Sequence, residues 1–93
     1  MSRVELFKKI TEDMFELYAR KNHDYGDSFM DTVDEFGLVA PAIRLSDKLN
    51  RFKTIIKSSS QVTDEKLEDT LIDMANYAIM TVIWMKNHDL SSN

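Results

Sequence analysis

The sequence predicts an all-α fold: a small antiparallel bundle of about four helices in a single domain over residues 1–93. Apolar residues recur at helical steps of three and four in three long stretches, and no alternating strand pattern exceeds a few residues. The 93 residues contain only 2 Gly and 1 Pro, too few for the turns of a hairpin-rich β protein. We therefore expect helices joined by short connections.

The first predicted helix runs from about Arg3 to Lys21 and has one apolar face. The residues of that face are Phe7, Ile10, Met14 and Leu17, at steps of three, four and three. Ser2 precedes the first turn as a candidate N-cap, and Glu5, three residues later, completes a capping box.

A loop and a short helix follow. Residues 22–27 read NHDYGD, which interrupts the helical period with residues that favour turns, so we expect a loop there. Ser28 then caps a helix from about Phe29 to Phe36. Gly37 occupies the position of a C-terminal capping glycine.

The two longest predicted helices form a hairpin. Pro41 suits the first turn of the third helix, which runs to about Lys57. The expected core seam of that helix is Leu45, Leu49, Phe52 and Ile56. Residues 58–61 read SSSQ and are the predicted turn, after which Thr63 caps the last helix. That helix ends near His88, with an expected core stripe of Leu67, Leu71, Met74, Ala78, Val82 and Met85.

The last helix is apolar on more than one face. Off its main stripe lie Ile72, Ile79, Met80, Ile83 and Trp84. A helix that is apolar nearly all round is usually buried on all sides, and four short helices cannot bury it so fully. We therefore expect a symmetric homo-oligomer packed partly through this helix. The alternative is that a short helix of the same chain packs over the remaining apolar surface of the last helix.

Composition excludes several classes of function. The chain has 12 Lys and Arg against 16 Asp and Glu, and this mild acidity argues against a duplex nucleic-acid partner. The absence of cysteine excludes disulfide scaffolds, zinc-finger-type sites and cysteine nucleophiles. The most apolar window, residues 74–85, is shorter than the roughly 20 residues of a membrane span, so no membrane partner is expected. No secretion signal is visible, which favours a cytoplasmic location, the host cytoplasm if a phage encodes the chain.

Two polar stripes are the candidate binding surface. On the third helix, Arg44, Asp47, Lys48 and Arg51 share a stripe roughly 100° wide. On the last helix, a second stripe contains Asp69, Asp73 and Asn76, with Thr70 and Tyr77 beside it. Each stripe is also explained as a solvated face with ion pairs, within one helix or between the two. A basic stripe that faces an acidic one is, alternatively, how phosphate and Mg²⁺ share a pocket.

The acidic residues predict a divalent cation as cofactor. Asp69 and Asp73 are four residues apart, where like charges repel, so the pair requires a counter-charge or a hard cation. Asp47, Asp69 and Asp73 are therefore candidate Mg²⁺ ligands.

The predicted loop adds further candidates. Lys21 is long enough to reach a phosphate, and Tyr25 offers a ring for a base to stack on. The alternative is that Tyr25 plugs the end of the bundle while Lys21 pairs with Asp24. The complete set of predicted nucleotide- or phosphate-binding residues is Lys21, Asp24, Tyr25, Arg44, Lys48, Arg51 and Tyr77.

Three sequence blocks resemble the family called nucleotide modification associated domain 1, which is common in bacteriophages. The blocks are residues 21–29 (KNHDYGDSF), Gly37 with residues 44–51 (RLSDKLNR), and residues 68–77 (EDTLIDMANY). The patterns K-x-x-D-Y-G and D-T-x-x-D-x-x-x-Y are the most specific parts. The blocks span about Lys21 to Tyr77, most of the chain, and the resemblance implies an all-α fold with a pocket for nucleotide phosphate.

More distantly, the chain is similar to the all-α nucleoside triphosphate pyrophosphohydrolases of the MazG and dimeric dUTPase group. Those enzymes bind Mg²⁺ through an E-x-x-E helix and an E-x-x-D helix. Asp73 matches the Asp of E-x-x-D, but Thr70 stands at the partner position and no E-x-x-E is present. The similarity thus implies the fold and the phosphate pocket rather than the full metal set.

Three functions follow from these observations. The first is a small phage-type protein that captures a phosphorylated nucleotide and sequesters a host defence signal, such as a cyclic dinucleotide or an ADP-ribose derivative. The second is a Mg²⁺-dependent nucleotide pyrophosphohydrolase or nucleotide-modification enzyme, with Asp69 and Asp73 on the metal. The third is a structural oligomeric module whose charged stripes are only solvated. The basic excess on the stripe around Arg44 favours the first.

Overall fold

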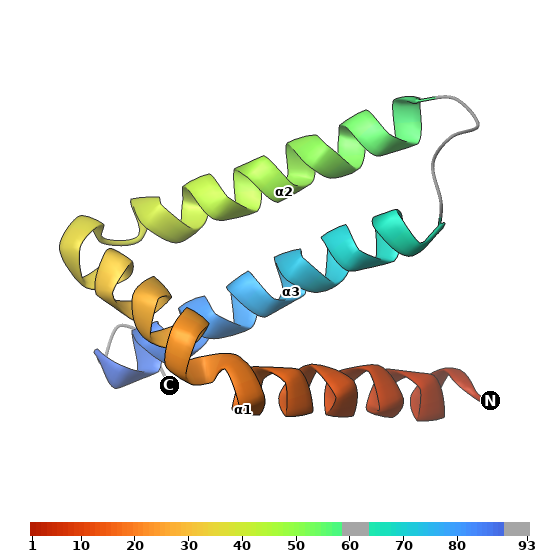
Figure 1. Cartoon of the computed structure of the whole chain (residues 1–93), viewed down its shortest axis with the longest axis horizontal. Coiled ribbons are helices and arrows are strands. Elements are labelled where there is room, and N and C mark those ends of the chain that lie inside the picture. The colour runs from red at the N-terminus through yellow and green to blue at the C-terminus, as the bar shows by residue number, and fades with distance from the viewer. Residues whose placement is uncertain (59–63, 89–93) are drawn as a thin grey trace.

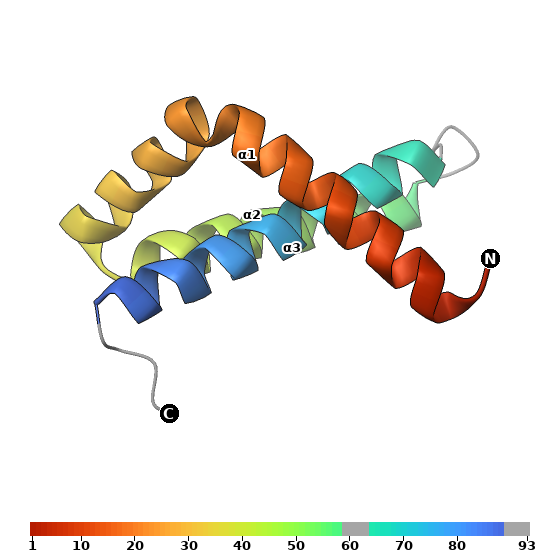
Figure 2. The same cartoon turned by 90° about the horizontal axis from the view of Figure 1, so that it is seen from below.

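The computed structural model describes the backbone of residues 1–58 and 64–88, and the side chains in those ranges except 22–26, 64 and 65. The described residues form three helices and no strand (Figure 1). The helices are α1 (Arg3–Phe36), α2 (Val39–Lys57) and α3 (Asp64–Asn87). α2 and α3 lie side by side and run antiparallel, and α1 crosses α3 (Figure 2). The predicted all-α class is confirmed.

The first two predicted helices belong to one element. The parts of α1 at residues 3–21 and 27–36 run in different directions, although they belong to one continuous helix (Figure 2). Because the backbone stays helical between them, the predicted loop at 22–27 is wrong, and Ser28 lies inside α1 rather than at an N-cap. Turn-favouring residues cost a helix interior only about 1 kcal/mol each, which a continuous hydrogen-bond ladder offsets.

The predicted capping interactions at Ser2 and Gly37 are both present. Glu5 N–H donates to Ser2 Oγ and Ser2 N–H donates to Glu5 Oε1, each at 3.1 Å. Contacts with the Ser2 side chain, and then with its backbone N–H, lower the pKa of the Glu5 carboxyl below its ordinary value. At the other end of α1, Gly37 has a φ of +76° and donates its N–H to Val33 O at 2.7 Å. Glycine adopts this φ without strain, so the helix ends there.

The second helix also agrees with its predicted limits. Pro41 is buried in the first turn of α2, which ends at Lys57 as expected. Ser58 N–H donates to Thr54 O and Ile55 O, which closes the last turn. The remainder of the predicted turn at residues 58–61, and the predicted cap Thr63, lie outside the described residues. None of the helices, over the residues described, is long and apolar enough to cross a membrane.

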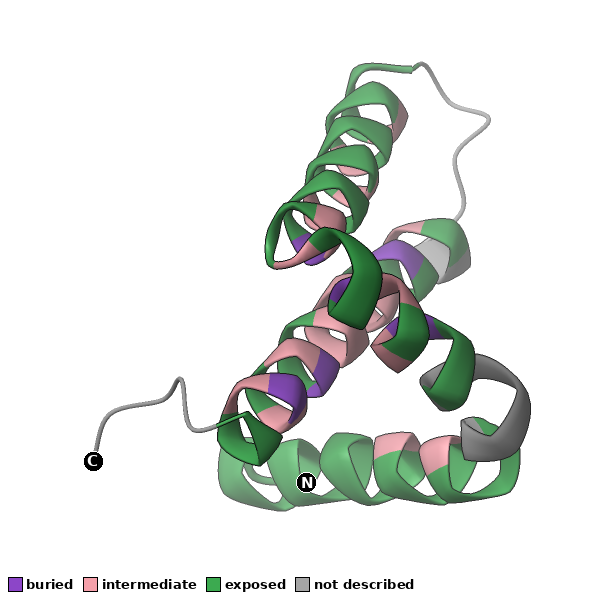
Figure 3. Cartoon of the chain, turned by 90° about the vertical axis from the view of Figure 1, so that its left-hand side faces the viewer, coloured by how far each residue is buried: buried purple, intermediate pink, exposed green. Residues whose placement is uncertain are grey.

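The core is small and lies where residues 27–36 of α1, the start of α2 and α3 meet (Figure 3). Val33 and Met80 are 0% and 1% exposed, and Phe29 and Trp84 complete the buried cluster. Trp84 Nε1 donates to Asp34 Oδ1 at 2.9 Å, which satisfies the indole as it leaves water.

The predicted core stripe of the last helix is wrong for Leu71, Ala78 and Val82, which are exposed, whereas Leu67, Met74 and Met85 are half-buried and Met85 packs against the core. Leu71 and Val82 are 46% and 47% exposed, whereas Met80 and Trp84 of the same helix are buried. The core-seam prediction also fails for Leu49 and Ile56 of α2 and for three of the four residues on the first apolar face, which are Phe7, Ile10 and Leu17.

The correction in α3 has a physical reason. α3 has two apolar faces, and periodicity cannot say which of them meets the rest of the chain. Met80 and Trp84 pack inward, because burying a side chain of this size contributes about 1.5–3 kcal/mol and Trp84 finds Asp34 as its acceptor. The small Ala75 and Ala78 belong to the opposite face.

Replacing Met80 by alanine should lower the free energy of unfolding by about 2–5 kcal/mol, because it leaves a cavity at the centre of the cluster. Urea denaturation followed by circular dichroism measures this change. Ile56→Ala, at an exposed position, is the matched control and should cost less than about 1 kcal/mol. Equal losses in the two variants would contradict the assignment of the core.

Asp34→Ala should cost about 1–3 kcal/mol of stability, because it leaves the indole N–H of buried Trp84 without its acceptor. Trp84 is the single tryptophan of the chain, so its fluorescence reports the unfolding directly. Asp31→Ala changes an exposed acid one turn earlier in α1 and should be nearly neutral. Similar midpoints for Asp34→Ala and the wild type would show that the hydrogen bond contributes nothing.

Candidate functional site

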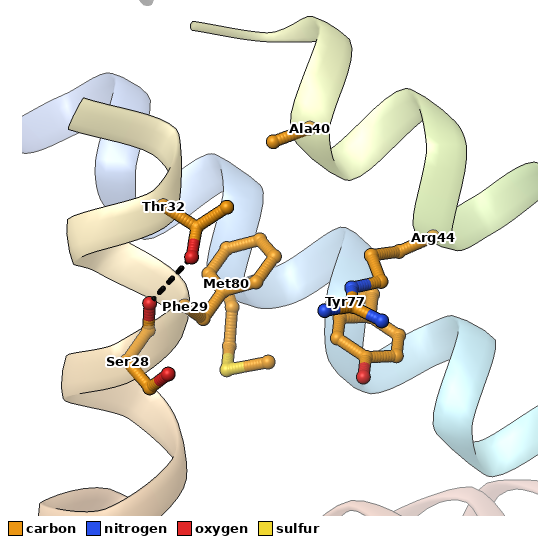
Figure 4. Close-up of a pocket in the computed structure, with 7 residues that line it drawn as sticks. All are labelled: Ser28, Phe29, Thr32, Ala40, Arg44, Tyr77 and Met80. Carbon is orange, nitrogen blue, oxygen red and sulfur yellow. Dashed lines mark hydrogen bonds between the residues drawn. The ribbon is translucent and has the colours of Figure 1, made fainter. Parts of the chain in front are cut away.

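The candidate site is a cavity of about 210 Å³ at the junction of the three helices (Figure 4). Its walls come from residues 27–36 of α1, the first turns of α2 and the middle of α3. The lining residues are Ser28, Phe29, Thr32, Ala40, Arg44, Tyr77 and Met80.

Aromatic and thioether side chains form the apolar part of this cavity. The rings of Phe29 and Tyr77 have centroids 5.6 Å apart and are tilted by 41°. Tyr77 and Met80 are three residues apart on α3, which places them on the same face of the helix. Phe29 and Met80 are buried and Tyr77 is half-buried, so the rings are held in place by the core while part of the tyrosine stays accessible. Ring surfaces of this kind are what nucleobases stack on.

Polar groups line the remainder of the cavity. Arg44 of α2 and Tyr77 of α3 lie together at one side, and Ser28 and Thr32 of α1 stand on the other (Figure 4). Thr32 Oγ1 donates to Ser28 O at 2.9 Å, which fixes the threonine rotamer. Arg44 is exposed and forms no ion pair with any side chain that the structure describes. Its guanidinium is therefore available for a bidentate contact with an anion.

An ion pair between α2 and α3 adjoins the cavity. Lys48 Nζ and Asp73 Oδ2 are 3.0 Å apart, with side chains 28% and 47% exposed. Because the helices are antiparallel, Lys48 lies one turn beyond Arg44, and Asp73 lies one turn before Tyr77. The structure thus brings the two predicted polar stripes together at this pair.

The other predicted site residues whose side chains the structure describes do not line the cavity. Asp47 and Arg51 are exposed on α2, and Lys21 is exposed on α1. Asp69 lies in a separate groove between α1 and α3, which Ile10 and Leu17 also line. The side chains of Asp24 and Tyr25 lie outside the described residues.

The cavity contains residues that the sequence analysis did not select. Ser28 and Phe29 stand at the end of the KNHDYGDSF block, so that block was the available signal. No sequence pattern marks Thr32, Ala40 or Met80 as a site residue, because their place in the cavity depends on how the three helices pack.

The predicted Mg²⁺ ligands have different surroundings in the described part of the chain. Asp73 is held by Lys48, and Asp69 faces a different groove. Within the described part of the chain, no group of three or more histidine or acidic side chains is placed to hold a metal ion.

Comparison with known proteins places the chain in a family. Searches of curated proteins and of solved structures gave no significant match. The family model described as nucleotide modification associated domain 1 matches residues 21–85. That range contains all of the described residues that line the cavity, together with the Lys48–Asp73 pair. The chain therefore belongs to the nucleotide modification associated domain 1 family.

Proposed function

We propose that this chain is a nucleotide-binding protein that captures a phosphorylated nucleotide in the cavity between α1, α2 and α3. The observation that carries the proposal is the combination of an unpaired Arg44 guanidinium with the rings of Phe29 and Tyr77 in one cavity. A nucleotide is a flat aromatic base joined to an anion, and the cavity offers a surface for each part. The hydroxyls of Ser28 and Thr32 are available as acceptors for the sugar.

The space around Arg44 is larger than this cavity alone. A second hollow of about 410 Å³ shares Thr32, Ala40 and Arg44 with the first, and continues over Phe36, Val39 and Ile43. Ligand pockets usually enclose roughly 300–1,000 Å³, so the two hollows together reach the ordinary range. The guanidinium stands at their common wall, and a phosphate bound there would have room on both sides.

Capture rather than turnover is the simpler chemistry for these residues. The charge next to the cavity is basic at Arg44 and neutralised at the Lys48–Asp73 pair, which suits binding of an anion. We further propose that the chain is encoded by a phage and acts in the host cytoplasm by sequestering a nucleotide signal used in host defence. Membership of a nucleotide-modification family supports the nucleotide part of this proposal.

One experiment separates the candidate functions. The protein is incubated with a panel of nucleotides, cyclic dinucleotides and ADP-ribose derivatives, with and without Mg²⁺, then denatured and analysed by chromatography. Recovery of an intact ligand supports capture. A cleaved ligand would instead assign a Mg²⁺-dependent hydrolase, and retention of no nucleotide would leave a structural module.

Arg44→Ala should weaken binding of the retained nucleotide by about 1.5–3 kcal/mol, roughly 10- to 150-fold, because it removes a charged hydrogen-bond donor. Calorimetric titration measures the dissociation constant. Arg3→Ala, a matched change at the far end of α1, is the control and should leave binding unchanged. Arg51→Ala shows whether the phosphate of the ligand extends along the polar stripe of α2 beyond Arg44. Unchanged affinity in Arg44→Ala with an intact fold would refute this site.

Asp73→Asn should tighten binding of a phosphorylated ligand, because it releases Lys48 one turn from the cavity. The same change should cost at most about 1 kcal/mol of stability, as is usual for a half-exposed ion pair. Asp69→Asn removes a carboxylate from the other groove and serves as the control for charge alone. If Asp73 held a metal ion, its loss would weaken binding in the presence of Mg²⁺, which is the opposite result.

A further inference from the structure

The isolated chain exposes more surface than a folded monomer of its mass. Its accessible surface is 7304 Å², whereas the mass–area relation gives about 5,500 Å² for 10.8 kDa. Its radius of gyration is 15.0 Å, against about 12 Å for a compact chain of this length. The excess of roughly 1,800 Å² in one chain is more than the roughly 800 Å² that each partner buries in a standard protein–protein interface.

Part of this surface is a continuous apolar stripe on α3. Leu71, Ala75, Ala78 and Val82, which we call the outer stripe, are spaced four, three and four residues apart and so share one face of the helix. Leu71, Ala78 and Val82 are exposed, and Ala75 is half-buried. The two alanines at its centre leave room for another helix backbone to approach closely.

Opposite charges stand at the two ends of the outer stripe. Glu68 lies three residues before Leu71, and Lys86 lies four residues after Val82, both exposed and on the same side of α3. Neither forms an ion pair with another described side chain. Each is nine residues from Tyr77, so the pattern is symmetric about the middle of the helix.

We propose that the outer stripe is a two-fold interface with a second copy of this chain, in which the two α3 helices pack antiparallel. A two-fold axis level with residue 77 places Glu68 of each copy opposite Lys86 of the other, and the apolar positions between them face one another. Parallel packing would instead set like charges against each other, so the charges select the antiparallel arrangement. The pattern is complementary to itself, which is the reason for choosing a second copy as the occupant.

This interface is independent of the proposed nucleotide binding. Met80 and Tyr77 of α3 line the cavity from the inward side of the helix, whereas the outer stripe lies on the side away from it. Two copies joined through α3 would keep both cavities open. The proposal can therefore succeed or fail whatever the nucleotide experiments give.

A single introduced cysteine tests the geometry, because the chain has none of its own. Ala78→Cys places a thiol close to the proposed axis, and mild oxidation should convert most of this variant to a covalent dimer on a non-reducing gel. Ala42→Cys, at an exposed alanine of α2, is the matched control and should remain largely uncrosslinked. Equal crosslinking of the two variants, or none in Ala78→Cys, would overturn the proposal.

Charge reversal tests the antiparallel register. Glu68→Lys and Lys86→Glu should each weaken self-association by about tenfold or more in light scattering, because like charges then meet twice across the axis. The double variant should restore it, while Lys53→Glu on α2 should have no effect. Circular dichroism verifies that each variant keeps its helix content.

Three results in light scattering would refute the interface. The wild type could have the monomer mass of 10.8 kDa at tens of micromolar. Each single charge reversal could leave self-association unchanged, or the double variant could stay dissociated. A monomeric wild type that binds lipid vesicles through Leu71 and Val82 would assign the stripe to a membrane surface instead. Larger assemblies in which Ala78→Cys still crosslinks pairwise support the proposal.

Discussion

The inward packing of the bulky face of α3 is the constraint on which the remaining structure depends. Met80 and Trp84 fill the space left by α1 and α2, and the Asp34 carboxylate accepts the indole hydrogen bond. With α3 turned in this way, Tyr77 reaches the cavity and Asp73 reaches Lys48. The same rotation sends the alanine-rich face outward. The orientation of α3 about its own axis therefore places the candidate site on one side of the helix and an apolar surface on the other.

Interactions within a few residues were predictable from the sequence, and those that depend on packing were not. The capping box of Ser2 and Glu5 and the end of α1 at Gly37 are set by neighbouring residues, so local patterns were sufficient. Residues 22–27 favour turns when each is considered alone, so the sequence predicts a loop there. The helical backbone hydrogen bonds of the segments on either side continue through these residues instead. The core face of α3 was missed because both of its faces satisfy a helical period.

The same distinction applies to the candidate site. Arg44 and Tyr77 were predicted because each lies on a polar stripe of its own helix, a pattern that a helical wheel reveals. Phe29 and Met80 resemble ordinary core residues in sequence, and only the meeting of three helices shows that they also line a cavity. The three predicted carboxylate ligands, Asp47, Asp69 and Asp73, were drawn from two helices, and the structure gives them different surroundings.

The tight corner at Gly37 has a consequence for how a ligand would be received. Only Gly37 and Leu38 separate α1 from α2, and the Gly37 N–H is bonded to Val33 O, whose side chain is fully buried. Phe29 and Arg44, which stand in two walls of the cavity, therefore belong to helices that are joined by one short, hydrogen-bonded connection. The buried core packs against the inner side of this connection. Such a corner has few alternative shapes, so the width of the cavity is set before any ligand arrives. A molecule that fits would bind without first ordering the backbone, and little of its affinity would be lost to reorganisation.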